Sequence, residues 1–278
     1  MVAVLLGLTA GLCYGAADFC GGLATKRTAM FAVVLIAQFA GLLLLLACLP
    51  FFPAHPQATD YLWGAAGGVC GAVGLALLYH ALSIGKMGVV SPITAVLAAA
   101  LPVGVGVIHG DHLAATQTAG IAIALVAIVL ISLSFEDNGR REIATEGVKE
   151  AIASGILLGC FFLCLAQSHR SAGLHPLVAA RIASMGFLFV LALVTRSDLR
   201  PRNGTLPLIV LSGTLDMSAN ALYVLATYHG YLAVAAVLTS LYPASTVFLA
   251  RVILKERLQM SQKIGVTLAL LGVGLIAS

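Results

Sequence analysis

The sequence predicts an all-α integral membrane protein with ten transmembrane helices in two inverted five-helix repeats. One observation behind this prediction is composition. Of the 278 residues, 60% are hydrophobic and 9% are charged, whereas a soluble domain carries about 25% charged residues. The other observation is an internal repeat. Residues 60–133 align without a gap with residues 205–278, and 17 of the 74 pairs are identical, against roughly 7 expected by chance. We therefore expect two related halves of apolar helices and no soluble domain.

Apolar runs that approach the length of a bilayer span, about 20 residues, recur along the whole chain. The first run resembles a secretory signal, but it lacks a basic start and continues past Tyr14 to Ala24, so we interpret it as a span. Runs this long and continuous exclude the alternating strands of a membrane barrel. The predicted spans are 2–24, 31–50, 61–84, 87–108, 115–134, 151–169, 175–195, 206–228, 231–253 and 260–277.

Three of the predicted spans contain glycines or prolines in a pattern that bears on packing. The third span has glycines at i, i+3, i+4 and i+7, which lets helix backbones approach closely in lipid. We interpret this face as structural packing, with a homodimer interface as the alternative. Prolines interrupt the fourth and ninth spans and predict kinks, which serve as hinges or stay static. These residues are Gly64, Gly67, Gly68, Gly71 and Gly74, and Pro92, Pro102 and Pro243.

A long charged segment separates the two halves. We assign residues 1–134 to the first repeat, 135–149 to the linker and 150–278 to the second repeat. Because each half contains an odd number of spans, the halves must insert in opposite directions. Such inverted repeats are typical of transporters, whose substrate site lies between the repeats near the middle of the membrane.

The basic residues predict the orientation in the membrane. The odd-numbered loops and their helix ends hold 13 Lys and Arg residues, whereas the even-numbered loops hold only Arg170. Because basic loops stay in the cytoplasm, we expect the odd loops inside and both termini on the non-cytoplasmic side of the plasma (inner) membrane. The 13 residues are Lys26, Arg27, Lys86, Arg140, Arg141, Lys149, Arg196, Arg200, Arg202, Arg251, Lys255, Arg257 and Lys263.

The junction of the last two spans carries a recognisable pattern. Residues 242–276 contain Tyr-Pro-Ala-Ser-Thr, then Lys-Glu-Arg-Leu, then Gln262, Gly265 and a final Gly-x-Gly-x-Ile. The first half has a weaker version around Asp111, which aligns with Glu256. This pattern resembles the EamA repeat of the drug/metabolite transporter superfamily. The resemblance implies a ten-helix bundle with a central cavity, alternating access and export of metabolites such as amino acids or drugs. Many relatives keep both termini in the cytoplasm, whereas the charge bias here argues the reverse.

Two acidic residues lie inside predicted spans, where burial is costly and the default interpretation is functional. Asp18 lies in the first span, with Tyr14 four residues before it on the same helix face. Asp216 lies near the middle of the eighth span, and Asn220 and Tyr223 share its face. A buried acid could take up a proton or pair with a substrate ammonium group. A structural hydrogen bond or ion pair within the bundle is the alternative.

Further polar side chains complete the candidate site. Arg181 is the one basic residue well inside a predicted span, and it could hold a substrate anion, neutralise an acid or reach toward the membrane surface. Gln38 and Gln167 are weaker candidates that could instead bond a neighbouring helix. Tyr79 and Tyr242 could line a cavity with Tyr14 and Tyr223, whereas Tyr228 suits anchoring at the membrane interface.

Several other functions are excluded by the pattern of residues. The sequence has no phosphate-binding loop, no nucleophile elbow and no CxxC pair. The His-Gly-Asp-His run at 109–112 falls on the repeat junction, so we expect no metal or other cofactor. We therefore expect a proton-coupled exporter of a small polar or amphipathic metabolite, acting as a monomer or homodimer in the lipid bilayer without nucleic acid. An importer, an exchanger or a non-transporting scaffold is the alternative, and enzymatic activity is not expected.

Overall fold

The computed structural model describes residues 2–108, 115–135, 141–143, 146–229, 242–256 and 260–276. Nearly all of these residues are helical, as the sequence predicts. In the first half, the helices are α1 (Val2–Thr25), α2 (Met30–Cys48), α3 (Ala58–Ile84), α4 (Met87–Ile108) and α5 (Ala115–Ser132). In the second half, they are α6 (Val148–Ala166), α7 (His175–Val194), α8 (Leu206–His229), α10 (Tyr242–Ile253) and α11 (Met260–Ile276). Short 3-10 helices follow α2 (η1, Leu49–Phe51) and precede α7 (η2, Arg170–Ala172).

Four stretches in the described residues are long and apolar enough to cross a membrane. They are Met30–Phe51, Ala58–Ile84, Val148–Ala166 and His175–Val194, and the shorter apolar helices Met87–Ala98 and Lys263–Leu275 accompany them. Large hydrophobic side chains such as Phe51 (78% exposed) and Leu62 (70% exposed) lie on the outside. Their exposure fits a lipid environment. The protein is therefore an integral membrane protein of helical class.

The connection between the halves contains an element that the sequence analysis did not predict. We expected the fifth span to continue to residue 134, but α5 ends at Ser132 and is followed by β1 (Leu133–Phe135). This strand pairs antiparallel with β2 (Arg141–Ile143), and Ser134 lies opposite Glu142. The predicted ninth span, 231–253, is described only from Tyr242 onward, and the 109–112 run lies outside the described residues.

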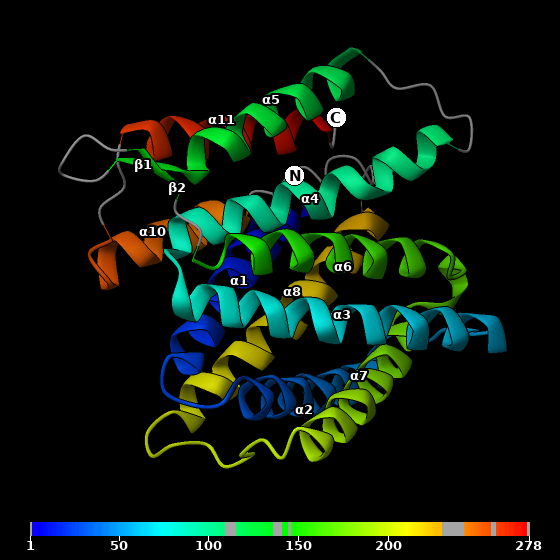
Figure 1. Ribbon diagram of the computed structural model, residues 1–278. Helices are drawn as coiled ribbons and strands as arrows, with labels where there is room; N and C mark the ends of the chain where they lie inside the picture. Colours follow the sequence, from blue (N-terminus) through cyan, green and yellow to red (C-terminus); the bar gives the residue numbers. More distant parts are fainter. Residues whose placement is uncertain are drawn as a thin grey trace.

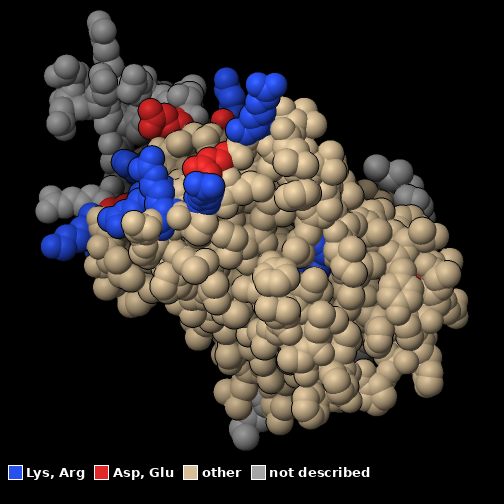
Figure 2. Space-filling view, turned by 90° about the horizontal axis from the view of Figure 1, so that it is seen from below, with Lys and Arg blue, Asp and Glu red and all other residues tan. Residues whose placement is uncertain are grey.

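The helices form a bundle with α2 and α7 on one side and α5 with α11 on the other (Figure 1). Between them, α3 packs against α6 and α7, and α4 packs against α6. Helix α1 crosses α8 and also contacts α3 and α10. Most helices run roughly in one direction across the bundle, so their ends gather at two opposite ends of the molecule (Figure 1). Lys and Arg side chains cluster at the left end in the view from below (Figure 2).

Glycines allow very close contact between helices of different halves. A Cβ atom on Gly68 of α3 would lie 2.2 Å from the carbonyl oxygen of Ala180 in α7, and one on Gly213 of α8 would lie 2.0 Å from that of Ala37 in α2. Gly64 meets Pro176 in the same way, at 2.2 Å. Backbone atoms cannot move aside as flexible side chains do, so these positions require glycine. The predicted packing role of the α3 glycines is confirmed, because α6 and α7 of the same chain cover this face.

Candidate functional site: a buried charged cluster between the halves

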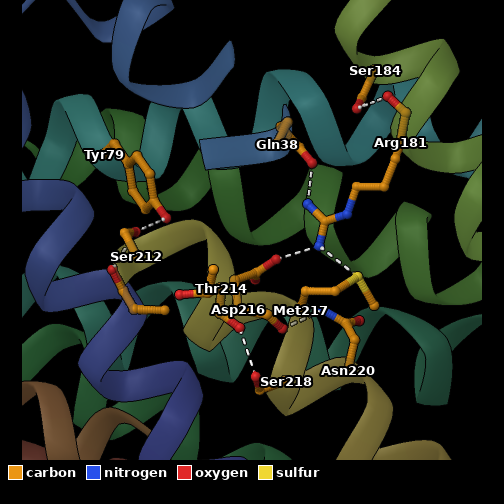
Figure 3. A network of polar contacts seen from close by, with 11 residues as sticks. Gln38, Tyr79, Arg181, Ser184, Ser212, Thr214, Asp216, Met217, Ser218 and Asn220 are labelled. Carbon is orange, nitrogen blue, oxygen red and sulfur yellow. Dashed lines mark hydrogen bonds and ion pairs between the residues drawn. The ribbon is translucent and has the colours of Figure 1, made fainter. Parts of the chain in front are cut away.

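Arg181 lies at the centre of a polar cluster formed by α2, α7 and α8. It is only 8% exposed, and it comes about one and a half turns after Pro176, which occupies the first turn of α7. Its guanidinium group donates hydrogen bonds to Oε1 of Gln38 in α2 and to Oδ2 of Asp216 in α8 (Figure 3). One NH₂ group also contacts the sulfur of Met217 at 3.8 Å. The arginine therefore joins one helix of the first half to two helices of the second.

A glycine beside the guanidinium group makes room for this arrangement. Gly41 follows Gln38 by three residues on α2, and a Cβ atom there would lie 3.7 Å from Cζ of Arg181 and 3.0 Å from the carbonyl oxygen of Gly213. Two helices can thus approach closely enough for the arginine to reach the carboxylate of Asp216. The sequence left three roles open for Arg181: binding a substrate anion, neutralising an acid or reaching toward the membrane surface. In the structure, Arg181 neutralises Asp216.

The cluster continues along one face of α8. The side chain of Asn220 donates a hydrogen bond to the carbonyl oxygen of Asp216 at 2.8 Å. One turn before Asp216, the hydroxyl of Ser212 donates to the carbonyl oxygen of Ala17 in α1 at 2.8 Å. Because this proton is used, the 2.9 Å contact between Ser212 and Tyr79 has the Tyr79 hydroxyl as its donor. Ser212, Asp216 and Asn220 are spaced by four, so the periodicity that singled out the last two extends to Ser212.

Asp18 is the second intramembrane acid, and it differs from Asp216 in its contacts. It is 7% exposed, and among the described residues its carboxylate has no hydrogen-bond or ion-pair partner. It lies close enough to Asp216 for the two negative charges to repel each other. With Arg181 and Asp216 paired, an ionised Asp18 would give the cluster an uncompensated negative charge, which is costly in an environment of low dielectric constant.

Aromatic side chains border this acid. The rings of Tyr14 in α1 and Tyr242 in α10 lie 6.2 Å apart at an angle of 58°. The hydroxyl of Thr246, one turn after Tyr242, donates to the carbonyl oxygen of Gly15 at 3.1 Å. Tyr14 also interacts electrostatically with Tyr223 of α8. Residues from α1, α8 and α10 therefore meet beside the charged cluster.

The structure brings most of the predicted site residues into one region. These are Tyr14, Asp18, Gln38, Tyr79, Arg181, Asp216, Asn220, Tyr223 and Tyr242. Gln167 lies apart, exposed at the end of α6, and the side chain of Tyr228 lies outside the described residues. Ser212 and Met217 were not predicted. The position of Ser212 one turn before Asp216 was a usable signal, whereas nothing in the sequence marks a buried methionine as a neighbour of arginine.

Comparisons with known proteins agree with the sequence pattern. Residues 146–278 match the model of the EamA-like transporter family. This part of the chain is therefore an EamA-like domain, and the resemblance found at residues 242–276 is confirmed. No curated protein matches the chain.

Solved structures show the fold over the whole length. One of the matching structures, titled "Crystal structure of protein", is 16% identical in sequence with a TM-score of 0.62. The match covers 98% of this chain and 95% of the other. The likeness extends through the first half, which the family model does not cover.

Proposed function

We propose that the protein is a secondary active transporter that exports a small polar or amphipathic metabolite, amino-acid-like or drug-like, in exchange for protons. The match to a family of membrane transporters supports the general class. The observation that carries the proposal is the contrast between two acids in the bundle: Asp216 is neutralised by Arg181, whereas Asp18 is buried and has no hydrogen-bond or ion-pair partner among the residues that the structure describes.

In this proposal, Asp18 carries the transported proton. A carboxyl group that is buried without a cation is best accommodated in its neutral form. Exposure of Asp18 to water on one side of the membrane would favour proton release, and its return to the buried environment would favour proton uptake. Asp18 and Asp216 repel each other, so the protonation of one affects the ion pair formed by the other.

Arg181 and Asp216 serve as the substrate-binding pair. Arginine binds carboxylates through a planar pair of donors. A substrate carboxylate can therefore replace Asp216 on Arg181, and the released Asp216 carboxylate can then receive a substrate ammonium group. Tyr14, Tyr223 and Tyr242 provide aromatic surface beside this position.

An inverted repeat is supported by residues that align with an offset of 145 positions and make similar contacts with the opposite half. Gly68 and Gly213 are such a pair, and each packs against the helix that follows the first helix of the other half. Asp60 and Thr205 are another pair. Asp60 binds His169 in the α6–α7 connection, and Thr205 binds Thr28 in the α1–α2 connection at 2.9 Å. Equivalent residues thus make equivalent contacts in the two halves, as rocking of one half against the other requires.

The charge distribution supports an orientation with both termini outside the cytoplasm. The α1–α2, α3–α4 and α7–α8 connections, which carry the exposed residues Lys26, Lys86 and Arg200, lie at the left of the bundle (Figure 1). Most of the Lys and Arg side chains visible in Figure 2 gather at one end of the molecule. Basic connections stay in the cytoplasm. The protein is placed in the plasma membrane as a monomer or homodimer, with a small-molecule substrate and surrounding lipid as its partners.

Transport by reconstituted vesicles tests the proposal. The purified protein is screened against zwitterionic, cationic and anionic metabolites with and without a proton gradient. Asp18→Asn should abolish the dependence on the gradient while exchange of substrate across the membrane continues. Asp216→Asn should abolish transport. Asp198→Asn is the control, because Asp198 is exposed and, among the described residues, accepts a hydrogen bond only from the nearby backbone N–H of Arg200. Gradient-driven transport at the normal rate by Asp18→Asn at every pH from 5.5 to 8 would assign proton coupling to another residue.

A further inference from the structure

Two carboxylates outside the central cluster connect the halves of the protein. The first is Asp60, in the first turn of α3, and it is 0% exposed. Its Oδ1 atom accepts a hydrogen bond from the backbone N–H of His169 at 2.8 Å and lies 2.9 Å from Nδ1 of the same residue. Its Oδ2 atom accepts from the backbone N–H of Gln57 at 2.8 Å. Asp60 therefore holds the α6–α7 connection of the second half against the start of α3.

The second carboxylate is Glu256, in the connection between α10 and α11. Lys255, two residues after the end of α10 and directly before Glu256, adopts a left-handed conformation (φ 56°). The two carboxylate oxygens of Glu256 accept hydrogen bonds from the backbone N–H groups of Met87 at 3.1 Å and Gly88 at 3.2 Å. These groups begin α4 and have no partner within their own helix. A residue of the second half therefore caps a helix of the first.

The two contacts lie at opposite ends of the bundle. Figure 1 shows the start of α3 beside the end of α6 on the right, and the start of α4 near the end of α10 on the left. At each end, a carboxylate of one half accepts from backbone N–H of the other, from His169 at Asp60 and from Met87 and Gly88 at Glu256. Such charge-assisted hydrogen bonds are stronger than neutral ones. The other cross-half polar contacts described at these ends are neutral. His55 donates its backbone N–H to Ser171 at 2.9 Å, and Thr28 bonds Thr205 at 2.9 Å.

We propose that Asp60 and Glu256 are the two gate residues of the transport cycle, and that each keeps one end of the protein closed until the other end has closed. This inference rests on the proposed transport function, because alternating access requires the halves to separate at one end at a time. Separation at the left end breaks the bonds of Glu256 to the start of α4. Separation at the right end breaks the bonds of Asp60 to His169.

Hydrogen–deuterium exchange of the full-length protein in lipid nanodiscs tests the proposal without a known substrate. Glu256→Gln should speed exchange of the backbone amides in residues 86–92 about tenfold, which corresponds to ~1.4 kcal/mol of weakened closure. Amides in residues 57–63 and 167–172 should exchange at the original rate or more slowly. Asp60→Asn should have the opposite pattern. Thermal unfolding of each variant reports whether it is folded.

Milder variants and a matched control complete the experiment. Glu256→Asp keeps the charge but shortens its reach, so it should have a smaller effect in the same direction. His169→Ala removes only the side-chain contact with Asp60 and should loosen only the right end. Glu150→Gln is the control, because Glu150 also lies in the first turn of a helix and has no described cross-half contact. It should leave both ends unchanged.

Three results would overturn the gate assignment: faster exchange at both ends in either variant, unchanged exchange in both, or loss of folding in the mild variants as well. If the ends open separately but no metabolite is carried in vesicles, the transport function fails and the gate contacts remain. If transport is found and exchange does not separate the two ends, the gate assignment fails alone.

Discussion

Removal of the Arg181 guanidinium group should destabilise the protein more than neutralisation of its partner. Arg181→Gln leaves the carboxylate of Asp216, whose side chain is 16% exposed, without a cation. It also removes the hydrogen bond that Arg181 donates to Oε1 of Gln38. Loss of one partner of a buried ion pair costs about 3–5 kcal/mol. We expect about 3 kcal/mol here, because Asp216 keeps some exposure. Asp216→Asn also leaves the charge of Arg181 without a counterion, but the Asn oxygen and Oε1 of Gln38 can still accept from the guanidinium group, so a smaller cost of about 1 kcal/mol is expected.

The double variant separates the ion pair from the other contacts of these residues. Arg181→Gln combined with Asp216→Asn leaves no buried charge at this point, and it should cost only about 2 kcal/mol rather than the roughly 4 kcal/mol of two independent changes. The difference of about 2 kcal/mol is the coupling energy. It can be measured by unfolding the four proteins in mixed micelles with increasing amounts of a denaturing detergent. Additivity of the two single changes within about 0.5 kcal/mol would refute the ion pair as an energetic unit.

Two further predictions concern packing and orientation. Gly68→Ala should destabilise the bundle by about 1–3 kcal/mol, because its Cβ atom would lie 2.2 Å from the backbone oxygen of Ala180. Gly186→Ala is the matched control, since no atom lies within 4 Å of a Cβ there, and equal unfolding curves for the two variants would contradict the close α3–α7 contact. A reporter that is active only in the cytoplasm should stay inactive when fused to Ser278, whereas an active reporter would reverse the proposed orientation.

The sequence determined the local features of this protein. Apolar runs of bilayer length follow from composition alone, and the helices begin and end near the predicted positions because apolar length is a property of a continuous segment. Periodicity also placed Asp216 and Asn220 on one face of α8, because residues four apart in a helix lie on the same side. The repeat and the junction pattern around Glu256 were also readable, because both depend only on the order of residues.

The tertiary structure decided which of these residues meet. The sequence left three roles open for Arg181, and packing of α7 against α2 and α8 selected the neutralisation of Asp216. Within the described part of the chain, the same packing provides no partner for the carboxylate of Asp18. The contacts of Asp60 with His169 and of Glu256 with the start of α4 join residues 109 and 169 positions apart. Helical periodicity specifies a face but not the neighbour of that face, so such pairs become visible only when the helices are packed together.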